Sequence, residues 1–211
     1  SLTDQNLIND YTNQNVVVVV AAGNGPGSGW APSVVNAENY GKRYYYPASY
    51  KNVISVSTVG NKNIPNSTIT PFDNWLNVHK IKTPPNSYYS GTSTLISETE
   101  IFNQHNDSVD IVVPSYRLPL IGAWSNNEYW AFEENGTFAG TSFSAPIVSG
   151  TVGLMFAVNY CLKPKEVESI LKLTATNIED IPENLPYKGK LGGGSLNAFR
   201  AVEMANEMAK P

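Results

Sequence analysis

One short segment places a serine where a nucleophile could work. Ser142 follows Gly140 and Thr141 and begins an apolar stretch that runs to Cys161. At the start of a helix the first backbone N–H groups have no partner and the helix dipole is positive. Both features favour a serine alkoxide and an oxyanion next to it. The alternative for an isolated serine is that Ser142 only caps the helix.

Asn24 is the second candidate, in a glycine-rich turn after a run of valines. The run Val16–Ala22 ends at Gly23-Asn24-Gly25. A continuous β-branched run is typical of a strand buried on both faces of a parallel sheet. Ligands in open α/β sheets bind outside the carboxyl ends of the strands, so the Asn24 amide could donate into a cleft there. The alternative is an asparagine that only holds a turn.

Apolar strands and helices alternate along the chain, which predicts an α/β fold with a parallel sheet flanked by helices. The stretch between about residues 60 and 108 is rich in Asn, Ser, Thr, Pro and Tyr, and we interpret it as inserted surface loops with one or two short hairpins. Thr3 is the expected N-cap of the first helix. Strands are predicted over Val16–Ala22, Asn52–Val59 and Val109–Val113, with a further strand or hairpin over Asn127–Phe138, and helices over Leu2–Gln14, Ser142–Cys161, from Pro164, and Asn197–Met208.

Composition limits the class of protein. The chain has 211 residues, which fits one domain over 1–211 or a large part of one. A net charge of −4 argues against a nucleic-acid partner, because no basic block exists to neutralise phosphates. One cysteine forms no internal disulfide, and no Cys/His spacing predicts a zinc site. Charged residues make up only 15%, a polar but weakly charged balance that favours a secreted, cell-surface or periplasmic protein.

A membrane partner is not expected either. The N-terminal stretch Ser1–Gln14 is polar and has neither the basic start nor the apolar centre of a signal peptide. Residues Thr137–Leu162 carry no charge and are long enough to cross a bilayer. However, the stretch is rich in small residues, contains Pro146 and lacks aromatic and basic flanks, so we interpret it as a core helix.

Five segments, in this order, resemble the second half of a subtilisin-like serine protease. They are Val16–Gly25, Tyr46–Val56, Asp110–Pro114, Gly140–Pro146 and Gly194–Ala198. The resemblance covers nearly the whole chain apart from the loop-rich stretch. It implies a three-layer sandwich that is incomplete in this chain, and a catalytic domain of which the chain is the C-terminal part.

The resemblance also implies a role for individual residues. Ser142 matches the nucleophile, and Asn24 matches the side-chain oxyanion donor, with the Ser142 backbone N–H as the second donor. The substrate, a peptide or protein, would bind against neighbouring residues, among them one wall of the pocket for the side chain before the cleaved bond. These substrate-binding residues are Ala21, Ala22, Gly23, Gly25 and Thr141.

Three positions depart from the family pattern. Phe143 stands where the family usually has Met, and Ile147 stands where His is frequent. Gly25 replaces an often acidic residue, which removes a charge near the pocket. We therefore expect uncharged or apolar side chains before the cleaved bond.

A general base and its orienting acid are missing from the chain. The family carries them upstream of the oxyanion asparagine in Asp-[Ser/Thr]-Gly and His-Gly-[Thr/Ser] segments, and neither segment occurs here. The two histidines, His79 and His105, fall in the loop-rich stretch and are interpreted as polar surface residues.

The expected partner of the chain is therefore the N-terminal fragment of the same domain, or a second copy joined by swapping, because an incomplete sheet leaves an exposed edge. The chain alone should be inactive. The alternative is a catalytically inactive subtilisin-like scaffold used for binding. No cofactor is expected: calcium is common in the family, but the sequence has no dense carboxylate loop, and no metal site is predicted.

Overall fold

The computed structural model describes residues 1–24, 42–59, 80–81, 100–101, 104–114, 121–124, 128–131 and 140–210. The strands are β1 (Val19–Ala21), β2 (Ile54–Val59), β3 (Lys80–Ile81), β4 (Glu100–Ile101), β5 (Ile111–Pro114), β6 (Ile121–Trp124) and β7 (Glu128–Ala131). The helices are α1 (Leu2–Asn13), α3 (Thr141–Val158), α4 (Pro164–Thr174), α5 (Ala198–Met208) and the 3₁₀ helix η2 (Pro182–Tyr187).

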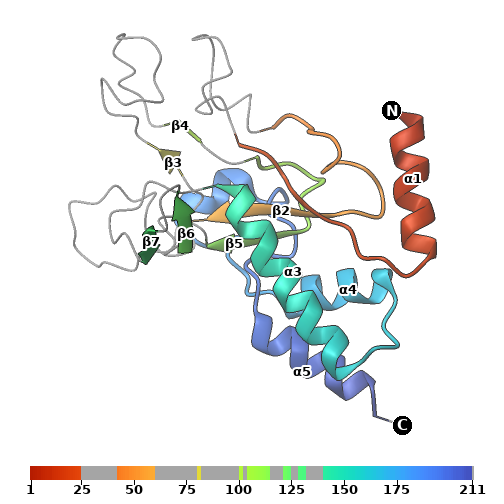
Figure 1. Ribbon diagram of the computed structural model, residues 1–211. Coiled ribbons are helices and arrows are strands. Elements are labelled where there is room, and N and C mark those ends of the chain that lie inside the picture. The colour runs from red at the N-terminus through yellow and green to blue at the C-terminus, as the bar shows by residue number, and fades with distance from the viewer. Residues whose placement is uncertain are drawn as a thin grey trace.

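The central sheet is parallel and has the strand order β1-β2-β5. Val19 lies opposite Ile54, and Val56 lies opposite Ile111. Every residue of β2 is buried, as expected for a middle strand covered on both faces. The predicted α/β fold with a parallel sheet flanked by helices is therefore confirmed (Figure 1).

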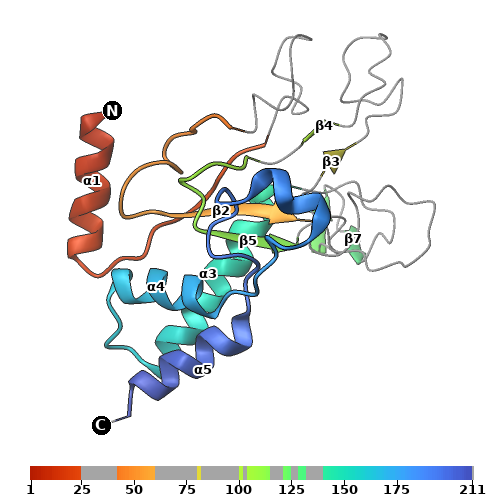
Figure 2. The ribbon, with the colours of Figure 1, turned by 180° about the vertical axis from the view of Figure 1, so that it is seen from behind.

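The helices form a layer on one face of the sheet. α3 crosses this face and contacts all three strands, while α5 packs against α3 and α4 (Figure 1). The opposite face is covered by the segment that contains η2, the blue coil in front of β2 when the molecule is seen from behind (Figure 2). The first turn of α3 lies at the carboxyl ends of the strands, where the Ser144 hydroxyl donates to the Val113 carbonyl.

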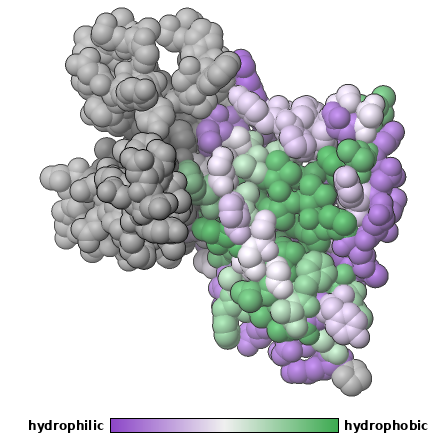
Figure 3. All heavy atoms as spheres, in the orientation of Figure 1, coloured by the Kyte–Doolittle hydropathy of each residue, from purple (hydrophilic) through white to green (hydrophobic). Residues whose placement is uncertain are grey.

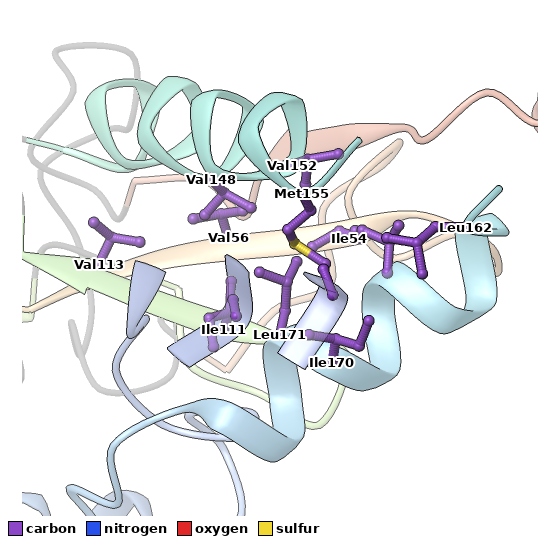
Figure 4. Packing of buried hydrophobic residues seen from close by; sticks show 13 residues of the cluster. Ile54, Val56, Ile111, Val113, Val148, Val152, Met155, Leu162, Ile170 and Leu171 are labelled. Carbon is purple, nitrogen blue, oxygen red and sulfur yellow. The ribbon is translucent and has the colours of Figure 1, made fainter. Parts of the chain in front are cut away.

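The main core lies between the sheet and this helical layer. Val148, Val152 and Met155 of α3 point toward the sheet and meet Ile54 and Val56 of β2 (Figure 4). Burying each such side chain stabilises the fold by about 1.5–3 kcal/mol. The remaining buried members come from β5, from α4 with the turn before it, and from α5, namely Ile111, Val113, Leu162, Val167, Ile170, Leu171, Ala201 and Ala205.

Helix α3 is long and apolar enough to cross a membrane by length and composition, and a third of it is buried inside the chain. Its inner face belongs to the core just described. Its outer face remains exposed, with Leu154 58% exposed. The interpretation as a core helix is consistent with the packed face.

Several predicted boundaries were wrong. Strand β1 begins at Val19 and not at Val16, because its neighbour β2 begins only at Ile54, opposite Val19. The N-cap of α1 is Ser1 and not Thr3: the Ser1 hydroxyl and the Asp4 carboxylate form a capping box. Helix α3 begins at Thr141, one residue before the predicted start, and ends at Val158.

The interpretation of His105 as a surface residue was also wrong. Its side chain is fully buried and packs edge-on against the ring of Tyr187, with the ring centroids 4.7 Å apart. Most of the predicted loop-rich stretch, His79 included, lies outside the described residues. The described parts include the antiparallel pair β3–β4 within that stretch and the antiparallel pair β6–β7 after it.

Candidate active site

The structure brings Asn24 and the start of α3 together across 117 residues of sequence. The Asn24 side-chain oxygen accepts a hydrogen bond from the Thr141 backbone N–H at 3.0 Å and another from the Thr141 hydroxyl at 3.1 Å. Asn24 comes from the turn after β1, and Thr141 is the first residue of α3. The two sequence-predicted segments therefore form one site at the carboxyl end of the sheet.

These two bonds also fix which way the Asn24 amide points. A backbone N–H can only donate, so the oxygen of the amide must face Thr141. The amide NH₂ group must then point away from Thr141. A donor held in this way loses little freedom when it binds an acceptor, which is the requirement for stabilising an oxyanion.

Ser142 is the second residue of α3, and its side chain is exposed. In this first turn the Thr141 N–H donates to the Asn24 side-chain oxygen, and the Phe143 N–H donates to the Gly140 carbonyl at 3.0 Å. The helix N-cap is Gly140, whose φ of 134° suits glycine and few other residues. The simpler interpretation of Ser142 as the N-cap is therefore wrong, and its hydroxyl does not serve as the cap of its own helix.

Gly23 connects the predicted pocket wall to this site. Its N–H donates to the Thr141 hydroxyl at 3.2 Å, and its φ of 112° again lies in the region that favours glycine. Ala22 is buried and donates to the Val56 carbonyl at 2.8 Å, while Ala21 is half-buried in β1. Gly25, the fifth predicted residue, lies outside the described residues.

Sequence reasoning missed Gln104, which lies next to this site. Its backbone N–H donates to the Gly23 carbonyl at 3.1 Å, and its side chain is fully buried. It falls at the end of the stretch that was interpreted as surface loops. No apolar pattern marks the segment, so the sequence carried no signal of its burial.

The principal buried charges lie at the other end of the sheet. The Asp110 carboxylate, just before β5, is 2.5 Å from the Lys172 ammonium and accepts the Ser55 N–H at 2.8 Å. Burial raises the pKa of Asp110, and Lys172 and the Ser55 N–H offset part of that shift. Burial lowers the pKa of Lys172, but hydrogen bonds to Asp110 and Glu168 outweigh burial and raise it. This cluster is remote from Asn24, so we assign it to stability.

A metal centre finds no support in the part of the chain that the structure describes. Within those residues no three His, Cys, Asp or Glu side chains gather closely enough to hold an ion. For the residues outside the described part, the expectation that the chain has no metal site stays a prediction.

The profile of the subtilase family of peptidases matches residues 1–197. This chain belongs to the subtilase family. The match includes both Asn24 and Ser142, so the resemblance drawn from the five sequence segments is confirmed at the level of the family.

Curated relatives agree with this assignment. The cell wall-associated protease of Bacillus subtilis is 27% identical over 139 residues, which are 57% of this subtilase chain and 15% of that protein. Subtilisin-like protease 3 of Plasmodium falciparum is 22% identical over 189 residues, or 80% of this chain and 23% of that protein.

Solved structures show the same fold. Fervidolysin from Fervidobacterium pennivorans, a keratinolytic enzyme related to subtilisin, matches 96% of this chain with a TM-score of 0.59 and 19% identity, and the chain covers 25% of it. A protease of Pseudoalteromonas arctica matches 97% with a TM-score of 0.57 and 22% identity, and the chain covers 47% of it. The subtilase chain thus spans at most about half the length of these proteins, and its predicted partial character agrees with that fraction.

Proposed function

We propose that this chain is the C-terminal part of the catalytic domain of a serine endopeptidase. Ser142 is the nucleophile, and Asn24 and the Ser142 backbone N–H are the oxyanion donors. The acid and the base come from the upstream part of the same domain, so the chain alone is inactive. Membership of the subtilase family supports the reaction class, and the site geometry supports the roles of the residues.

One observation carries this proposal. The double hydrogen bond from Thr141 to the Asn24 oxygen holds a side-chain donor next to the first turn of the helix that bears Ser142. A turn-holding asparagine would be satisfied by its own loop, whereas Asn24 reaches a helix 117 residues away. The exposed Ser142 hydroxyl is not used as a cap, so it is available for chemistry.

The reaction would be acyl transfer. The upstream histidine takes the proton of the Ser142 hydroxyl, and the oxygen attacks the peptide carbonyl. The negative charge that develops on the carbonyl oxygen is held by the Asn24 NH₂ and the Ser142 N–H. The C–N bond breaks, the histidine protonates the leaving amine, and water then hydrolyses the acyl group from Ser142.

The upstream part would dock on the open side of β1. In the described part of the chain, β1 pairs only with β2. Val18 accepts from the Ile54 N–H and Ala22 donates to the Val56 carbonyl, so the odd-numbered residues of β1 direct their backbone groups to the free edge. An added parallel strand could pair with those groups.

The side chains at this edge are apolar as well. Figure 3 shows a broad hydrophobic area on this face. A groove of about 500 Å³ is lined by Tyr11, Val16–Val19, Ser149 and Val152. Such a patch marks an interaction surface. The chain fills only about half of the solved structures it matches, so we assign the groove to the missing half of the same domain rather than to a swapped second copy.

Two coarser expectations accompany the proposal. With Gly25 in place of an acidic residue, uncharged side chains should be preferred before the cleaved bond. The weakly charged composition favours a secreted or cell-surface location, as the name of the cell wall-associated relative also suggests.

The second candidate is an inactive scaffold that binds without cleaving, because the chain itself carries neither catalytic segment. The upstream coding sequence separates the two: Asp-[Ser/Thr]-Gly followed by His-Gly-[Thr/Ser] supports the enzyme, and their absence supports the scaffold.

The direct test is hydrolysis of a peptide library by the full-length protein. We expect cleavage that disappears in Ser142→Ala and persists in Ser169→Ala, a matched change at an exposed serine of α4. Cleavage that survives in Ser142→Ala would remove Ser142 from the reaction.

A further inference from the structure

Ser144 joins the first turn of α3 to the central sheet through its side chain. It lies two residues after Ser142 and is fully buried. Its hydroxyl donates to the carbonyl of Val113, in β5, at 3.2 Å. Because this bond links residues that are 31 positions apart in sequence, it fixes where the turn lies on the sheet rather than how the helix is wound.

Other hydroxyl groups of α3 behave differently. The Ser149 hydroxyl donates to the Ala145 carbonyl at 3.1 Å. The Thr151 hydroxyl donates to the Ile147 carbonyl at 3.0 Å. Both bonds run back four residues within the same helix, a local bond that serine and threonine often form there. Ser144 instead directs its hydroxyl out of the helix and onto a strand.

Thr141 holds the same turn at the opposite edge strand. Its backbone N–H and hydroxyl bind the Asn24 oxygen, and its hydroxyl also accepts the Gly23 N–H. Asn24 and Gly23 follow β1, whereas the partner of Ser144 lies in β5, and these are the two outer strands of the sheet. The turn that carries Ser142 is therefore anchored on both outer strands, once on each side of Ser142 in sequence.

We propose that Ser144 is a positioning residue for the nucleophile and the oxyanion donors. Ser142 supplies its hydroxyl and its backbone N–H from this turn, while the Asn24 NH₂ comes from the end of β1. The two donors must keep a fixed separation to hold one oxyanion, and a misplacement of about 1 Å can lower a rate on the order of 100-fold. This inference rests on the proposed function and adds a residue to its site.

The first test measures kcat and KM of the full-length protein. Ser144→Ala should lower kcat by about tenfold with little change in KM, because it frees one of the two anchors and leaves the substrate contacts in place. Ser144→Thr, which keeps the hydroxyl, should recover most of the rate. If Ser144→Ala does not fold, Ser144→Cys keeps the shape of the side chain with a weaker donor and should also lose rate.

Thr151→Val is the matched control, since it removes another buried hydroxyl from the same helix. It should leave kcat unchanged. A role of Ser144 in stability alone would lower the free energy of unfolding in both variants, measured in urea, without changing kcat of the folded protein. That result would contradict the inference.

A double variant tests whether the two anchors hold one turn. Ser144→Ala combined with Thr141→Val should lower kcat by more than the product of the single losses, about 100-fold, because each single variant keeps the other anchor. Losses that only multiply would show that the two residues act independently and would contradict a shared turn.

Amide hydrogen exchange gives a readout that needs no catalysis. The Thr141 N–H is bound by the Asn24 oxygen, so the peptide that begins α3 should exchange faster in Ser144→Ala and at the wild-type rate in Thr151→Val. Unchanged exchange and unchanged kcat in folded Ser144→Ala would contradict this inference alone. A wild type that cleaves no peptide would contradict the proposed function, while faster exchange in Ser144→Ala would still support the anchor on β5.

Discussion

The two edge strands of the parallel sheet differ in whether their outer side is paired. At the β5 edge, Val112 donates to the Gly194 carbonyl at 3.0 Å and accepts from the Leu196 N–H at 2.9 Å, so the chain's own C-terminal segment closes the edge. At the β1 edge, no described segment pairs with the strand, and an apolar groove lies beside it. The described chain thus closes the β5 edge by itself and leaves the β1 edge, which leads to Asn24, unpaired.

The closed edge is also the more tightly packed one. A Cβ at Gly192 would fall 2.2 Å from the Asp110 backbone, and a Cβ at Gly193 would fall 2.7 Å from the Lys172 carbonyl. Asp110 and Lys172 then form an ion pair across the same contact. We therefore expect substitutions there to change stability, and substitutions at the open side to change turnover.

The largest expected effect is at the open side. Asn24→Leu in the full-length protein should lower kcat by about 100- to 1,000-fold with little change in KM, the loss known for such a donor in a subtilisin. The reason is that the amide is needed only when the carbonyl oxygen becomes charged. Steady-state kinetics with Asn13→Leu, an exposed asparagine of α1, as the control would check this. An unchanged kcat would contradict the oxyanion role.

The next effect is at the closed edge. Lys172→Met leaves the Asp110 carboxylate, only 14% exposed, without its cation. The free energy of unfolding should fall by about 1–3 kcal/mol, less than for a fully buried pair because the Lys172 side chain is 37% exposed. Urea denaturation of the full-length protein measures it, with Lys165→Met on the same helix as the control. A Lys172→Met variant with a lower kcat and an unchanged free energy of unfolding would contradict the assignment of the β5 edge to stability.

Thr141→Val should lower kcat by about tenfold, because Asn24 keeps the backbone N–H of residue 141 and loses the hydroxyl. Thr141 is a positioning residue, so Thr141→Ser, which retains the hydroxyl, should restore most of the rate. KM should barely move in either variant. Equal losses in the Val and Ser variants would show that the side chain matters for packing rather than for orientation.

The smallest effect is on the pH dependence of stability. Since the pKa of Lys172 is raised in the folded state, its contribution is fully present below the ordinary lysine pKa and is lost as pH rises through the folded value. The free energy of unfolding of the wild type should therefore decline more steeply in the alkaline range than that of Lys172→Met. Parallel alkaline profiles would contradict the ion pair.

Local patterns predicted the parts of the site that depend on chain order. The valine run placed Asn24 after a buried strand, and the glycine before Thr141 and Ser142 marked the start of a helix. Both predictions hold to within a few residues. The two hydrogen bonds that orient the Asn24 amide could not be predicted, because they join segments 117 residues apart.

Burial of the polar segment before β5 could not be predicted either. Gln104 and His105 have no apolar periodicity around them, yet both are fully buried because the ring of Tyr187 and the turn at Gly23 pack over them. The start predicted for β1 was too early for a related reason: a strand is defined by its pairing, and the pairing of β1 with β2 begins only at Val19, opposite Ile54.

The central claim is that Ser142 is an activated nucleophile. A fluorophosphonate probe, followed by peptide mapping of the full-length protein, tests it most directly, since only a serine with a working base and oxyanion donors reacts readily. We predict a phosphonyl adduct on Ser142 that is lost in Ser142→Ala and kept in Ser169→Ala, at an exposed serine of α4. Failure of the folded protein to react at Ser142 would contradict the account and favour the inactive scaffold.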